Sequence, residues 1–67
     1  MPFRNYTQFD TATLDIMAAA YDAVVKRLDL KSDNPLTSKL ASKIAAIAAE
    51  GERDVGKLTE RALTGLN

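Results

Sequence analysis

Three groups of residues that favour helix ends divide the 67-residue chain into three segments. They are Asp10, the pair Asn34-Pro35, and the run Gly51-Glu52-Arg53-Asp54. Asp and Asn are favoured as N-caps, proline is favoured in the first helical turn, and glycine is favoured just after the last turn. These positions predict three helices, over about 11–30, 35–50 and 55–65, with almost no residues left for other structure.

Apolar residues recur in each segment at intervals of three and four, as in a helix with one buried side. The expected inward positions are Leu14, Met17, Ala18, Tyr21, Val25 and Leu28 in the first segment, Leu36, Leu40, Ile44 and Ile47 in the second, and Val55, Leu58, Ala62 and Leu66 in the third. No segment alternates between apolar and polar residues as a half-buried strand would. The sequence therefore predicts an all-α fold, a compact three-helix bundle forming one domain over residues 1–67.

An aromatic N-terminal arm precedes the first helix. Phe3, Tyr6 and Phe9 are three of the four aromatic residues of the chain, and Phe9 and Leu14 are spaced as a hydrophobic staple across the helix start. We expect residues 1–9 to fold back and cover the core. The alternative is that Phe3 and Tyr6 dock onto a neighbouring subunit or another partner, since Tyr and Phe are favoured at the centres of interfaces.

The first helix also carries a small-residue patch, which we define as Ile16, Ala19, Ala20 and Ala23. One interpretation is that the helix uses both of its apolar sides inside the bundle, one against each partner helix. The other is that the patch forms the contact of a homo-oligomer, because small side chains let two backbones approach closely. A chain this short has a small core and no cysteine for a disulfide or a zinc site, so self-association is one of its few further sources of stability.

Glu52 and Arg53 lie in the corner between the second and third helices, where we expect them to be exposed. Arg53 is placed to reach a carboxylate such as Glu50, or the last carbonyl groups of the second helix. The alternative is that Glu52 and Arg53 contact a partner, since charged residues on a rigid corner are well placed for recognition.

A tight turn containing glycine also joins the two helices of a helix-turn-helix DNA-binding unit. Lys57 and Arg61 would then belong to the recognition helix. Glu50, Glu52 and Glu60 lie close to them in sequence, whereas binding to phosphates calls for a basic patch. A small helix-turn-helix-like nucleic-acid-binding regulator is therefore the alternative to our preferred function, and nucleic acid is not an expected partner.

The composition offers few groups for catalysis or metal binding. The chain has no His, Cys or Trp, and its 9 basic residues balance 9 acidic ones. Asp15, Asp22 and Asp29 recur every seven residues, which places them about 10 Å apart on one stripe of a helix, too far to share an ion. We interpret them as a solvated row, with Asp22 and Lys26 spaced as an ion pair. We expect no enzymatic activity, no cofactor and no metal.

Two short motifs suggest a relationship. Phe9-Asp10 followed by Thr13, and the run 51–54 followed by Leu58 and then Ala62-Leu63, resemble a group of small alphaproteobacterial proteins of unassigned function with an FD-x-x-T helix start and a G-E-R-D corner. That group often has proline after the corner, whereas this chain has Val55 and then Gly56, so the start of the third helix is less rigidly set. The resemblance implies an all-α fold and a bacterial cytosolic origin, and it brings no activity, cofactor or catalytic residue.

The N-terminal residues lack the basic stretch and apolar run of a secretory signal, and no segment approaches the ~18 apolar residues that a membrane span needs. We therefore expect a cytoplasmic protein that does not enter membranes. The function that the sequence favours is a non-enzymatic protein–protein interaction or self-association module.

Overall fold

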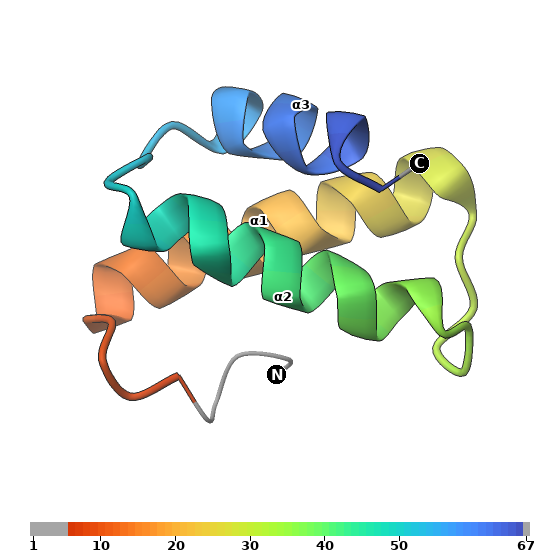
Figure 1. Ribbon diagram of the computed structural model, residues 1–67, viewed down its shortest axis with the longest axis horizontal. Coiled ribbons are helices and arrows are strands. Elements are labelled where there is room, and N and C mark those ends of the chain that lie inside the picture. The colour runs from red at the N-terminus through yellow and green to blue at the C-terminus, as the bar shows by residue number, and fades with distance from the viewer. Residues whose placement is uncertain (1–5, 67) are drawn as a thin grey trace.

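The computed structural model describes residues 6–66, which form three helices and the segments that connect them. Helix α1 spans Thr11–Leu28, α2 spans Leu36–Ala49 and α3 spans Val55–Thr64. Figure 1 shows α2 running back along α1, with α3 lying along the same pair of helices. Every pair of helices is in contact, and residues 6–66 contain no strand. The predicted all-α three-helix bundle is confirmed.

Helix α1 begins as predicted and ends earlier. The Asp10 carboxylate accepts a hydrogen bond from the Thr13 backbone N–H at 2.8 Å. At the other end Asp29 adopts the left-handed conformation, with φ 52°. The N–H of Leu30 donates to the carbonyl of Val25 at 3.0 Å, which is the Schellman arrangement that ends a helix. Because an Asp occupies the position usually taken by glycine, the sequence pattern places the end two residues too late.

The starts of α2 and α3 are fixed by the expected side chains. The Asn34 amide oxygen accepts from the N–H of Leu36 at 2.9 Å, and Pro35 already has helical angles of φ −60° and ψ −20°. The Asp54 carboxylate accepts from the N–H of Lys57 at 2.9 Å. Both short polar side chains thus satisfy backbone donors that the first helical turn leaves free.

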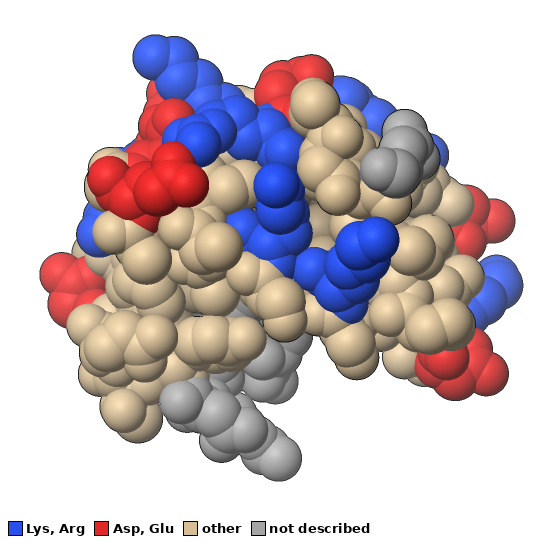
Figure 2. All heavy atoms as spheres, viewed as in Figure 1, with Lys and Arg blue, Asp and Glu red and all other residues tan. Residues whose placement is uncertain are grey.

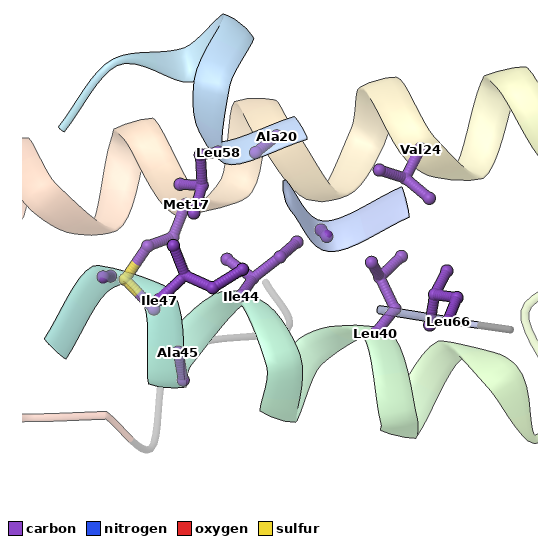
Figure 3. Packing of buried hydrophobic residues seen from close by; sticks show 11 residues of the cluster. Met17, Ala20, Val24, Leu40, Ile44, Ala45, Ile47, Leu58 and Leu66 are labelled. Atoms are coloured by element: carbon purple, nitrogen blue, oxygen red, sulfur yellow. The ribbon is translucent and has the colours of Figure 1, made fainter. Parts of the chain in front are cut away.

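The core lies where the three helices meet. Figure 3 shows Met17 from α1, Ile44 and Ile47 from α2, and Leu58 from α3 converging on one region. Met17, Ile44 and Leu58 are completely buried. The buried apolar residues are Met17, Ala20, Val24, Leu40, Ile44, Ala45, Ile47, Ala48, Leu58, Ala62 and Leu66. Most of the inward positions predicted for the second and third segments are among them.

The buried stripe of α1 is turned relative to the prediction. Ala20 and Val24 are completely buried, whereas Leu14 and Tyr21 are only half-buried at the edge of the core and Leu28 is 43% exposed. The centre of the buried side thus includes a small residue, Ala20, together with Met17 and Val24. Apolar periodicity identifies the buried side of a helix more reliably than it identifies the residues at the centre of that side.

One inward position predicted for α3 is also wrong. Val55 is 37% exposed, and Thr59 is buried instead. The Thr59 hydroxyl donates to the carbonyl of Val55 at 2.7 Å, so its polar group is satisfied within the helix.

The aromatic arm covers the core over the residues that the structure describes. Tyr6 and Phe9 are half-buried and pack against the core, with ring centroids 6.4 Å apart. The N–H of Phe9 donates to the carbonyl of Tyr6 at 3.3 Å and closes the turn between them. Phe3, the third aromatic residue of the predicted arm, lies outside the described residues.

Candidate interaction surfaces

The small-residue patch predicted on α1 does not form one exposed surface. Ala20 is completely buried, Ile16 and Ala23 are half-buried, and Ala19 is exposed. The prediction that Ala20 belongs to a subunit interface is therefore wrong. The physical reason is the turned stripe of α1, which brings Ala20 to the centre of the bundle.

The buried side of this patch faces α3. Ile16, Ala20, Ala23 and Arg27 follow one another at helical spacing and so lie on one stripe. At the end of that stripe, Nη1 of Arg27 lies 3.2 Å from Oε1 of Glu60 in α3. The arrangement agrees with the first interpretation of the patch, in which α1 uses both of its apolar sides inside the bundle.

The corner between α2 and α3 is held by its own side chains. Nη1 of Arg53 donates to the carbonyl of Ala48 at 2.7 Å and to the carbonyl of Glu52 at 2.9 Å. Arg53 therefore reaches the C-terminal carbonyls of α2, one of the two contacts expected from the sequence. Gly51 has φ 111°, a conformation that a residue with a side chain rarely adopts.

Arg61 joins the corner to α3. Its Nη2 donates to Oε1 of Glu50 at 2.5 Å, and its Nη1 lies 3.6 Å from Oε1 of Glu52. Hydrogen bonding to Glu50 raises the pKa of Arg61 above its already high usual value, so the group stays charged. The side chain of Glu52 is only 18% exposed, in contrast to the exposure expected for it, whereas Arg53 is exposed as expected. The corner is thus a rigid, charged feature of the surface.

Contacts between α2 and α3 show that the two helices form a hairpin. Glu50, just after α2, meets Arg61 in the last turn of α3, and the side chain of Lys43, in the middle of α2, lies over Gly65. Figure 1 accordingly shows α3 returning along α2.

A shallow depression lies along the exposed side of α3, next to the corner. Its volume is about 600 Å³, and Glu52, Asp54, Gly56, Lys57, Glu60 and Arg61 line it. Gly56 brings bare backbone to the surface there, and a side-chain carbon on it would lie 3.2 Å from Oδ1 of Asp54. The lining mixes both signs of charge, which suits a polar contact with another surface better than binding of one kind of ion.

All ion pairs within residues 6–66 involve α3. They join Arg27 to Glu60, and Arg61 to Glu50 and Glu52. The predicted pair between Asp22 and Lys26 is absent from them. Several charged side chains of residues 6–66 form none of these ion pairs. They include Asp15, Asp22 and Asp29 in or next to α1, Lys39 and Lys43 in α2, and Lys57 in α3.

Charges of both signs lie on α1, where Asp15, Asp22 and Lys26 are all exposed and form no ion pair with a described residue. Asp15 and Asp22 are exposed on the side of α1 opposite the buried Met17 and Val24. Figure 2 shows basic side chains gathered in a band across the face formed by α2 and α3, with acidic side chains at several places around it. The sequence did not indicate this band, because Lys39 and Lys43 join the bases of α3 only once the hairpin has folded.

The described residues contain no group of three His, Cys, Asp or Glu side chains placed to hold a metal ion. Within the same part of the chain, each helix is too short or too polar to cross a membrane. Comparisons with protein-family models, curated proteins and solved structures give no match to this chain.

Proposed function

We propose that this protein is a non-enzymatic, cytoplasmic module that acts by protein–protein interaction, first of all by self-association. The observation that supports this proposal is that several exposed charged side chains form no ion pair with a described residue. Asp15 and Asp22 lie on one helix, and Lys39 and Lys43 lie on another, without ion pairs to any described residue.

The bundle offers a firm support for such contacts. Its own ion pairs and the hydrogen bond of Arg53 to the end of α2 link the two helices of the hairpin that carries many of these charges. Complementary charges across an interface increase the rate of association and select the partner. A net charge of zero also removes the overall repulsion that keeps highly charged proteins apart.

Sedimentation of the purified chain over a range of concentrations tests this proposal. At low salt we expect the mean mass to rise with concentration from that of a 7.3 kDa monomer. Because exposed charges are screened by salt, the mass at a given concentration should fall as salt is added. A chain that stays monomeric throughout, at low salt and millimolar concentration, would exclude self-association and leave only docking to a different protein.

One observation favours nucleic acid as a second candidate partner. Lys39, Lys43 and Lys57 lie on the α2 and α3 side of the bundle without ion pairs to described residues. Glu50 and Glu52 lie at one end of this region and already bind Arg61, so few positive charges are left for phosphates. We therefore rank this candidate second.

A further inference from the structure

We infer that self-association occurs by exchange of α3, so that α3 of each copy packs on α1 and α2 of the other. The side of α1 and α2 that α3 covers in the single chain, which we call the receiving surface, includes Met17 and Ile44 (Figures 1 and 3). Each half of the dimer is then a three-helix bundle built from two chains. This inference rests on the proposed function and specifies how two copies join.

The single chain leaves little apolar surface for an ordinary contact between two copies. Among the described residues, Leu28 and Val55 are the large apolar side chains that are exposed, at 43% and 37%. Leu28 ends α1 and Val55 begins α3, and Figure 1 shows these two helix ends well apart along the bundle. They therefore do not form one patch. Exchange of α3 needs no such patch, because it uses apolar contacts that the chain already makes.

A second copy can supply the contacts that hold α3 in the bundle. Leu58, Ala62 and Leu66 are buried in the core that α3 shares with α1 and α2. Glu60 is paired with Arg27 of α1. These contacts do not depend on which chain α3 belongs to, so they form again between the two chains. The apolar surface buried in each half of the dimer is therefore the same as in the single chain.

The corner at 51–54 can act as the hinge by becoming part of a helix. Both prolines of the chain precede α2, so no proline prevents α2 and α3 from joining into one continuous helix. Arg53 then leaves the carbonyl of Ala48, which accepts the N–H of Glu52 instead, as in any helical turn. Short connections between packed elements favour this kind of exchange. The hydrogen bond lost when the corner opens is thus replaced.

Gly51 keeps the corner closed in the single chain. Its φ is 111°, and apart from its neighbours in sequence no heavy atom lies within 4 Å of the place where a side-chain carbon would stand. Glycine adopts this conformation without steric cost, whereas alanine is the better residue for a straight helix. The residue at position 51 therefore sets the balance between the closed chain and the exchanged dimer.

The exchanged dimer is closed and two-fold symmetric. Each chain gives one α3 and receives one, so the receiving surface of each copy is filled and no place is left for a third copy. The exposed charged side chains lie outside the exchanged core, where the two halves of the dimer touch. Salt screens the charges at that contact, so association by exchange still responds to salt.

Two substitutions at the corner test the inference, because they change the equilibrium in opposite directions. Val55→Pro fits the closed chain, since proline is favoured in the first helical turn and Asp54 already has the extended angles that a following proline requires. In a continuous helix the same proline removes a hydrogen bond and clashes with the preceding turn. Gly51→Ala has the reverse effect, because a φ of 111° is unfavourable for alanine. By sedimentation we expect dimerisation to be about tenfold or more weaker for Val55→Pro and about tenfold or more stronger for Gly51→Ala.

Gly56→Ala is the matched control for Gly51→Ala. It makes the same change five positions further on, inside α3, where the glycine has no positive φ. We expect it to dimerise within about twofold of the wild type, because α3 is helical in both states. Far-UV circular dichroism and thermal unfolding check that Val55→Pro remains folded.

A mixing experiment detects the exchange itself. Ile44→Asp places a charge in the receiving surface and Leu58→Asp places one in α3, both at completely buried positions, so each variant alone lacks an intact core. In an equimolar mixture, exchange combines the unaltered α3 of one variant with the unaltered receiving surface of the other. We expect the helix content of the mixture, by far-UV circular dichroism, to rise above the mean of the two separate samples. Ile44→Asp mixed with Met17→Asp is the control, since both changes lie in the receiving surface and exchange restores no intact bundle.

The outcomes separate the inference from the proposed function. If the wild type associates and both corner variants associate equally well, the contact lies elsewhere and only this inference is overturned. The same holds if the test mixture gains no more helix than the control mixture. If the wild type is monomeric under all conditions, both the inference and self-association fail.

Discussion

At the scale of single residues, the caps connect sequence to stability most directly. Hydrogen bonding from the side chain and the backbone N–H of Thr13 lowers the pKa of the Asp10 carboxyl below its usual value of about 3.9. The folded chain therefore holds the charged carboxylate more tightly than the unfolded chain does. This stabilisation is present above the unfolded pKa and is lost as the pH falls through the lower, folded pKa.

The lowered pKa of Asp10 leads to a prediction for the variant Asp10→Asn. Asparagine still accepts a hydrogen bond at the cap, but it carries no charge to interact with the start of α1. We expect the wild type to have the higher midpoint of thermal unfolding at pH 6, and the difference to shrink as the pH falls below about 4. Thermal scans of both proteins from pH 6 to pH 2.5 measure it. A difference that grows on acidification would contradict the role given to the carboxylate.

The sequence predicts such local features well when one residue type dominates a position. Asp10, Asn34 and Asp54 cap their helices, and Gly51 takes the positive φ expected of it. The left-handed conformation of Asp29 was missed, because glycine is the residue usually found there and Asp adopts it much less often.

At the scale of helices, the rotation of α1 about its axis decides which substitutions it tolerates. Ala19 and Ala20 are neighbours in sequence, but the first is exposed and the second is completely buried. A charge placed in the interior without a partner costs several kcal/mol, comparable to the whole stability of a domain of this size.

We therefore expect Ala20→Glu to unfold the chain and Ala19→Glu to leave it folded. Both replace alanine by the same residue in the same helix, so helix propensity is matched and burial alone differs. Far-UV circular dichroism and thermal unfolding compare them. A folded Ala20→Glu protein of unchanged stability would mean that α1 is turned towards the small-residue patch predicted from the sequence.

The sequence could not predict which residues lie at the centre of the buried side of α1. Apolar periodicity shows which side is buried, but it does not rank the positions within that side. Leu14 and Tyr21 have larger side chains than Ala20. The apolar pattern of the sequence therefore centres on Leu14 and Tyr21. In the folded chain two helices pack against α1, and Ala20 is completely buried between them.

At the scale of the whole molecule, the arrangement of charges is the feature that sequence reasoning could not supply. Arg27 and Glu60 are separated by 33 positions in sequence and meet only through packing of α1 on α3. The same holds for the band that combines lysines of α2 with bases of α3. Spacing along one helix predicted the row of aspartates on α1, but it could not predict contacts between residues of different helices.

This distribution predicts weak binding to nucleic acid. Neutralising only a few phosphates releases few counterions, so the affinity for duplex or single-stranded DNA at moderate salt should be no better than non-specific values of about 10⁻⁴–10⁻⁶ M. Fluorescence anisotropy with labelled oligonucleotides measures it, and Lys39→Glu provides the comparison. Tighter binding with a steep salt dependence that Lys39→Glu weakens would promote the second candidate function above the first.

The burial of Leu66 has a consequence for the synthesis of the chain. This residue is 6% exposed and packs with Leu58 and Ala62 to close the core on the side of α3. Until it has emerged from the ribosome, Met17 and Ile44 lack the helix that covers them. The nascent chain therefore gains little from folding as it appears. We therefore expect its apolar residues to stay accessible to chaperones or to other chains during that interval.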